Sequence, residues 1–189
     1  GVVDFYEGPT GTERRVRREH PDGVVDFYEG RKNRERRVRR KDPDGNVYFF
    51  EDFMGNARLV RKELSNGTVE FYDGTKDNEH LVQHTYTDGV VDVYEGPKDN
   101  ERLVRKQFPN GKMRFYEGTK DNERLVRHQY TDGSVDFYEG TKDNEHLVRR
   151  EYAGGGPVQF YEGTASNEHL VRAEYANGVV DFFEGPMNR

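Results

Sequence analysis

A unit of 22 residues recurs along the whole chain and limits what the chain can fold into. Segment 67–74 returns as 89–96 and again as 111–118, and each copy is followed by a block that begins with Asn-Glu. A fixed period of this size is typical of stacked arrays, in which each unit contacts only its neighbours. The sequence therefore predicts one repeat array over residues 1–189, with repeats starting at residues 1, 23, 45, 67, 89, 111, 133 and 156 and a half repeat at 178–189.

Two kinds of turn divide each unit, whose positions we number 1 to 22 from the glycine that starts it. Asp-Gly or Asn-Gly joins most neighbouring repeats, and this dipeptide between alternating apolar residues predicts a two-residue type I′ hairpin turn. The second connection is a polar loop such as 96–100, in which Asp and Asn tolerate left-handed backbone. The turns leave two strands per repeat, at positions 2–7 and about 13–21.

The predicted fold is all-β: an elongated array of antiparallel β-hairpins, with about 17 strands in a single twisted meander sheet. Both predicted turns place the same positions on the same face, so a single register satisfies them. That register predicts these cross-strand neighbours: Phe115 with Val126, Tyr116 with Leu125, Glu95 with Arg102, Asp92 with Arg105, and Lys106 with Phe115.

Composition narrows the class of protein. Charged residues make up 35% of the chain and hydrophobic residues 32%, yet Phe and Tyr recur at fixed positions, which a disordered chain would not select. The net charge of −6 comes from interleaved charges and argues against a general nucleic-acid binder. The absence of cysteine excludes disulfides and thiolate metal sites, and we see neither a membrane-helix stretch nor a signal-peptide pattern.

The candidate chemical groups are copied from repeat to repeat. Glutamates at positions 7 and 13 occur in nearly every unit, whereas catalysis needs one special constellation, so we interpret them as ion ladders and expect no enzyme. The Lys-Asp-Asn-Glu loops favour turn chemistry over calcium binding. His80 and His84 are predicted to share a face at about 13 Å, which is too far for one metal. We expect no cofactor and no metal.

Two local features interrupt the regularity. The runs 14–18 and 36–40 are rich in arginine and suggest contact with an acidic partner or with lipid headgroups. Phe53 and Met54 stand in a predicted loop where other repeats have Thr and Lys, which suggests a local contact.

The Tyr-Glu-Gly block that follows each Asp-Gly turn, as in segment 88–96, resembles MORN repeats, which are also hairpins stacked into an elongated sheet. MORN units carry a Gly-x-x-x-Gly-x-Gly run in the second strand, where this chain has the segment 100–105. The sequence motif is more similar to that of uncharacterised protist arrays with the pattern Phe-Tyr-Glu-Gly-x4-Glu-Arg-x-Val-Arg. The MORN resemblance implies scaffolding and contacts with proteins or near membranes.

We therefore expect a non-enzymatic structural or protein-interaction scaffold with an unidentified protein partner, and self-association or membership of a longer array remains open. The alternative is a module that binds carbohydrates or lipid headgroups multivalently, with peripheral membrane contact. The candidate interaction surface combines a tyrosine column with an arginine column on one predicted face: Tyr72, Tyr94, Tyr116, Tyr138, Tyr161, Arg105, Arg127, Arg149 and Arg172.

Overall fold

The structure is a computed structural model, and it describes residues 1–53 and 56–185. It confirms the all-β class: the described residues hold seventeen strands that pair in antiparallel fashion, and their helical structure is a single short 3₁₀ turn. The chain divides into two compact units, one comprising residues 1–87 and 96–101 and the other residues 88–95 and 102–189. The repeat pattern does not predict this division. We describe each unit by itself.

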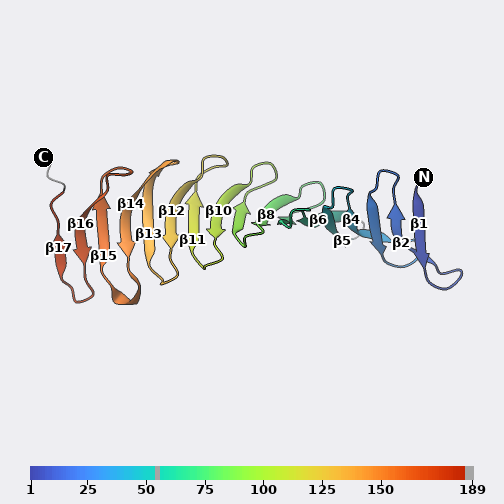
Figure 1. The fold of residues 1–189 in the computed structure, drawn as a ribbon, viewed down its shortest axis with the longest axis horizontal. Helices are drawn as coiled ribbons and strands as arrows, with labels where there is room; N and C mark the ends of the chain where they lie inside the picture. The colour runs from blue at the N-terminus through green and yellow to red at the C-terminus, as the bar shows by residue number, and fades with distance from the viewer. Residues whose placement is uncertain (54–55, 186–189) are drawn as a thin grey trace. The chain divides into compact units, whose positions relative to one another are not determined.

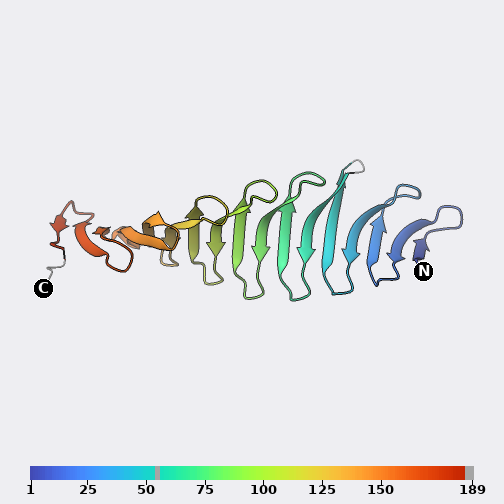
Figure 2. The ribbon, with the colours of Figure 1, turned by 90° about the horizontal axis from the view of Figure 1, so that it is seen from above.

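Unit 1 is a meander of eight strands, seen broadside in Figure 2, in which neighbours in the chain are neighbours in the sheet. The strands are β1 (Val3–Glu7), β2 (Arg14–Glu19), β3 (Val25–Glu29), β4 (Arg36–Lys41), β5 (Val47–Phe53), β6 (Asn56–Glu63), β7 (Val69–Asp73) and β8 (His80–Thr85).

Unit 2 continues the same plan with nine strands, which lie side by side in chain order in Figure 1. They are β9 (Val91–Glu95), β10 (Arg102–Gln107), β11 (Met113–Glu117), β12 (Arg124–Gln129), β13 (Val135–Thr141), β14 (Asn144–Glu151), β15 (Val158–Glu162), β16 (His169–Glu174) and β17 (Val180–Phe182). The extra residue of the repeat at 153–156 lies in the 3₁₀ turn η1 (Ala153–Gly155) between β14 and β15.

The turns between repeats differ from the prediction. His20 pairs with Val24 across a loop of three residues, and the Gly23 N–H donates to the His20 carbonyl. Gly23 has φ of 86°, whereas Asp22 is not among the residues with positive φ, so this is a type I turn followed by a left-handed glycine and not a type I′ turn. Proline at position 21 suits the second residue of a type I turn because its ring fixes φ near −65°.

A β-bulge interrupts the second strand of every repeat. Tyr116 pairs with Leu125 as predicted, but Phe115 pairs with Arg127, so Val126 is the extra residue and the predicted Phe115–Val126 pair is wrong. Beyond the bulge the register is shifted by one: Lys106 pairs with Asp92 and with Arg114. The predicted pairs of Asp92 with Arg105 and of Lys106 with Phe115 are therefore wrong, whereas Glu95 with Arg102 is confirmed.

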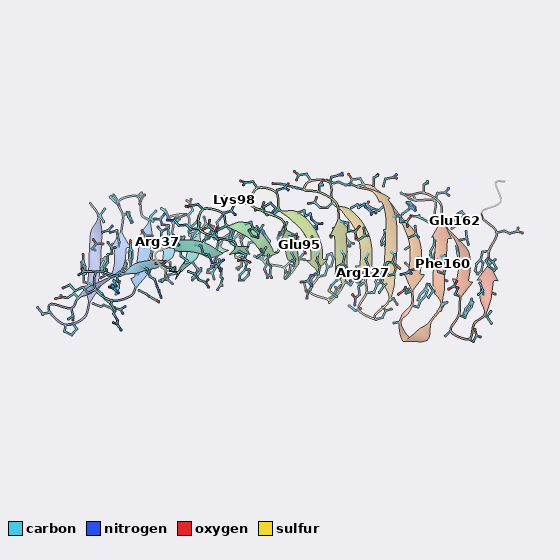
Figure 3. All side chains as sticks on the ribbon, turned by 180° about the vertical axis from the view of Figure 1, so that it is seen from behind. Arg37, Glu95, Lys98, Arg127, Phe160 and Glu162 are labelled. Carbon is cyan, nitrogen blue, oxygen red and sulfur yellow. The ribbon has the colours of Figure 1, made fainter. Side chains whose placement is uncertain are left out.

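The bulge decides which side chains share a face, because successive residues of a strand point to opposite sides. Positions 5 and 17 lie on one face, which we call the Phe face, and positions 4, 6, 15 and 18 lie on the other, the Tyr face. Each unit is a single layer with side chains projecting from both faces (Figure 3). Among the described residues, Ala173 is the only buried apolar residue, and the others that are buried are polar: Asp26, Thr68, Asp92, Ser134 and Asp136.

Candidate functional site

The Tyr face holds a column of buried carboxylates at position 4. Asp136 is fully buried, and Arg150 donates two hydrogen bonds of 2.5 and 2.6 Å to it. Asp26 is held in the same way by Arg40, at 2.9 and 3.2 Å. Burial is the largest single influence and by itself would raise the pKa of each carboxyl, but the arginine hydrogen bond, a second hydrogen bond from Tyr130 or His20 and the nearby positive charge together lower the pKa below the ordinary value. These carboxylates are charged structural groups and are not available as general acids.

The tyrosines at position 6 cover this column and bond to it. The Tyr72 hydroxyl donates to Glu70 at 2.7 Å, and the Tyr161 hydroxyl donates to Gln159 at the same distance. Burial, followed by the hydrogen bond to Glu70, raises the pKa of Tyr72. The hydroxyls of Tyr72, Tyr138 and Tyr161 thus bond to position 4 of their own strand.

The Phe face carries alternating phenylalanine and arginine side chains. Arg127 lies 3.7 Å from the centroid of the Phe115 ring, and Arg172 lies 4.0 Å from that of Phe160. Figure 3 labels Arg127 on β12 and Phe160 on β15. Contacts of this kind are worth about 0.5–1 kcal/mol at exposed sites. The same column contains Arg17, Arg39, Arg61 and Arg149, each stacked over a phenylalanine ring.

The glutamates at position 13 do not form an ion ladder. Glu123 accepts a hydrogen bond of 3.1 Å from the backbone N–H of Leu103, at position 15 of the preceding repeat. The same bond recurs in both units, from Arg15 to Glu35, Leu59 to Glu79, Leu81 to Glu101, Leu125 to Glu145 and Leu147 to Glu168. By contrast, position 7 forms ion pairs in several repeats, such as the predicted pair of Glu95 with Arg102 at 3.1 Å.

The bulge separates the two columns of the predicted interaction surface. The tyrosines, Tyr72, Tyr94, Tyr116, Tyr138 and Tyr161, lie on the Tyr face, whereas the arginines, Arg105, Arg127, Arg149 and Arg172, lie on the Phe face. The prediction that they share one face is wrong. His80 and His84 are separated in the same way, because His80 pairs with Asp73 and His84 with Glu70.

A groove in unit 1 escaped the sequence-based interpretation. It has a volume of about 920 Å³ and is lined by residues of β3 to β6 and of the loop after β7: Glu29, Arg36, Val38, Phe50, Glu51, Asp52, Asn56, Arg58, Gly74, Thr75 and Lys76. A second hollow of about 400 Å³ shares Glu29 and Val38 with it and reaches Phe27, Arg39 and Phe49.

The irregularity of the third repeat accompanies this groove. Asp52 stands at position 8, where most repeats have glycine, and β5 and β6 extend beyond their counterparts until Phe53 pairs with Asn56. Phe53 therefore belongs to a strand and not to the predicted loop, whereas Met54 lies outside the described residues. Ala57 stands at position 13, so no carboxylate there can bond to the second repeat. These departures from the repeat were the sequence features that could have indicated the groove.

The loops show turn chemistry. Asp77, Asp99, Asp121 and Asp143 adopt left-handed backbone, with φ between 63° and 67°, as predicted for this position. In the described part of the chain, no group of three or more His, Asp or Glu side chains is placed to hold a metal ion. Over the same residues we find no helix that is long and apolar enough to cross a bilayer.

Comparison with known proteins identifies no relative from which a function could be taken. No protein-family model matches the sequence, and no curated protein matches it. Among solved structures the chain is similar to the "Crystal Structure of TcdB2-TccC3-TEV", with 10% sequence identity, a TM-score of 0.20, and coverage of 91% of this chain and 13% of that chain. A TM-score this low carries no argument about fold or function.

Proposed function

We propose that the chain is a non-enzymatic protein-interaction scaffold, as its resemblance to MORN repeats suggested. One observation carries the proposal: the chemical groups that recur in the repeats are engaged inside the sheet. Asp136 is bound by Arg150, Glu123 accepts from the Leu103 N–H, and the Tyr72 hydroxyl donates to Glu70. Groups bound in this way support a rigid repeated surface and leave little for catalysis.

The Phe face is the better supported contact surface of the two. Its arginine heads are 39–43% exposed at Arg17, Arg149 and Arg172, and arginine with aromatic side chains is enriched at protein interfaces. On the other face the hydroxyls of Tyr72 and Tyr161 are internally bonded, which also weakens the alternative of a carbohydrate module built on tyrosine and carboxylate pairs.

The test is a selection on the immobilised full chain with a displayed peptide library, run in parallel with a glycan array. We expect peptides of related sequence that bind saturably, and glycans that stay at background. Multivalent glycan binding without selected peptides would overturn the proposal in favour of the carbohydrate module. An absence of binders in both arms would count against an interaction scaffold.

A further inference from the structure

The second repeat has a charge unlike that of any other part of the chain. It holds 8 basic and 5 acidic residues, hence a net charge of +3, within a chain of net charge −6. Six of its cationic side chains are exposed and form no ion pair with any described residue. Lys32 donates a hydrogen bond to the Gly11 carbonyl, and the other five are Arg31, Arg34, Arg36, Arg39 and Lys41. This set of five, which we call the basic strip, follows β4 and the loop that precedes it.

The excess of positive charge in the second repeat is due in part to the residue at position 19. In the first, third, seventh and eighth repeats this position is glutamate, and its carboxylate pairs with the arginine at position 17, as Arg149 does with Glu151 at 2.9 Å. In the second repeat the residue is Lys41, so Arg39 stacks over Phe27 at 3.9 Å without a carboxylate partner. Arg36 faces Glu29 across the strands but does not come within ion-pair distance of it.

The basic strip borders both hollows. Arg36 lines the larger one, Arg39 lines the smaller one, and Val38 between them lines both. Arg36, Arg39 and Lys41 all lie on the Phe face, and at about 3.3 Å per residue they span roughly 17 Å along the strand. The site therefore combines a line of cations with a smaller hollow lined by Phe27, Val38 and Phe49 and a larger one lined mainly by polar residues, which include the acidic residues Glu29, Glu51 and Asp52.

We propose that this strip and its hollows bind an extended acidic segment of a partner protein, an inference that rests on the scaffold function proposed above. Guanidinium groups bind carboxylates in a bidentate fork, and an extended peptide presents side chains at intervals that match a strand. A flat bilayer surface would reach the exposed heads but would not fill the hollows. A nucleic acid would need open aromatic faces for stacking, whereas Arg39 covers the Phe27 ring.

The repeats themselves supply substitutions that should leave the fold intact. Arg31→Thr, Arg34→Asn and Lys41→Glu each introduce the residue that other repeats have at the same position, and together they change the charge by −4. A matched control in unit 2, Lys112→Val, Arg114→Asp and Arg124→His, changes the charge by the same amount and also uses residues found in other repeats. Circular dichroism and the melting temperature report whether both variants remain folded.

The probe is a fluorescein-labelled peptide in which Glu alternates with Ala and Phe, compared with the same peptide carrying Gln for Glu. We expect anisotropy titrations to show binding of the Glu peptide that weakens with salt, and a loss of about tenfold or more in the strip variant but not in the control. Equal losses in both variants, or equal binding of the Gln peptide, would overturn the inference.

Two further binding measurements test whether the basic strip binds a membrane or a nucleic acid instead of an acidic peptide. Sedimentation with phosphatidylserine vesicles and titration with labelled single-stranded DNA should show weaker dependence on the strip than the Glu peptide does. Strip-dependent binding to either one, without peptide binding, would replace the proposed partner. If the library selection yields peptides that are neither acidic nor sensitive to the strip variant, the scaffold proposal stands and this inference fails.

Discussion

At the scale of single residues, glycine at position 8 is required by the close return of the chain after the first strand of a repeat. Gly118 has φ of 123°, and a Cβ built there would lie 2.4 Å from the carbonyl oxygen of Asn122. We predict that Gly118→Ala lowers the free energy of unfolding by about 3 kcal/mol, measured by urea denaturation.

Gly111 supplies the control for that substitution. Its φ is 85°, but a Cβ there would meet only the Thr131 side chain at 3.6 Å, which is ordinary contact. Gly111→Ala should therefore lower the free energy of unfolding by about 1 kcal/mol, which is the cost of holding alanine in the left-handed conformation. Equal costs at the two glycines would contradict the steric explanation.

The buried carboxylate of Asp136 makes a second residue-scale prediction. Burial raises the pKa, but hydrogen bonds from Arg150, Tyr130 and Tyr138 and the positive charge of Arg150 together outweigh it, so the folded-state pKa lies below the ordinary value of 3.8. A lowered pKa contributes stability that is present above about pH 4 and is lost as the pH falls through the folded-state value. Asp136→Asn should cost about 2–3 kcal/mol at pH 7 and make stability depend less on pH below 4.

The exposed Glu139 lies on the same strand and provides the comparison. Glu139→Gln should leave the urea midpoint at pH 7 and its acid dependence nearly unchanged, since an exposed carboxylate contributes little. If Asp136→Asn and Glu139→Gln denature alike across the pH series, the buried pair is not a stabilising feature of the Tyr face.

At the scale of elements, the sequence predicted the strands and their order but not the register. A three-residue turn in place of a two-residue turn shifts the pairing by one, and the bulge at Val126 shifts it by one again. The sequence analysis asked only whether both turns place the same positions on one face. Because the two shifts are equal, the wrong register meets this criterion as well as the correct one does. The bulge itself has no signature in alternation, because valine fits a regular strand equally well.

The glutamate at position 13 joins neighbouring hairpins, so its removal should destabilise the preceding repeat as well as its own. We predict that Glu123→Ala lowers the free energy of unfolding by about 2 kcal/mol, because the Leu103 N–H loses a charged acceptor. Hydrogen exchange at Leu103 should accelerate as well. The exposed Glu117, 3.4 Å from Arg124, provides the contrast: Glu117→Ala should cost under about 1 kcal/mol. A larger cost at Glu117 would reverse our assignment of the two glutamates.

At the scale of the whole molecule, the repeat predicted the class of fold, because each copy meets nearly the same neighbours. It could not predict where the chain divides into two units or where a groove lies. The groove lies in unit 1 among residues of the second to fourth repeats, and Asp52, which lines it, is a departure from the repeat that is diluted when repeats are compared as a set. The proposed partner site lies within unit 1, beside this departure from the repeat.

The bulge that separates the two faces recurs in both units, and a chain without cysteine allows a direct test of it. The structure pairs Val25 with Lys41 in unit 1 and Met113 with Gln129 in unit 2. Cysteines introduced at these pairs should form a disulfide under mild oxidation, because directly opposed strand residues lie within the range that a disulfide spans.

The comparison pairs move one cysteine by a single residue, to Val25 with Arg40 and Met113 with His128, which the bulged register places on opposite faces. We predict rapid cross-linking of the first two pairs, seen as a mass loss of two hydrogens, and none of the second two. Cross-linking of Val25 with Arg40 and of Met113 with His128, but not of the opposed pairs, would contradict the bulge and the assignment of side chains to the two faces.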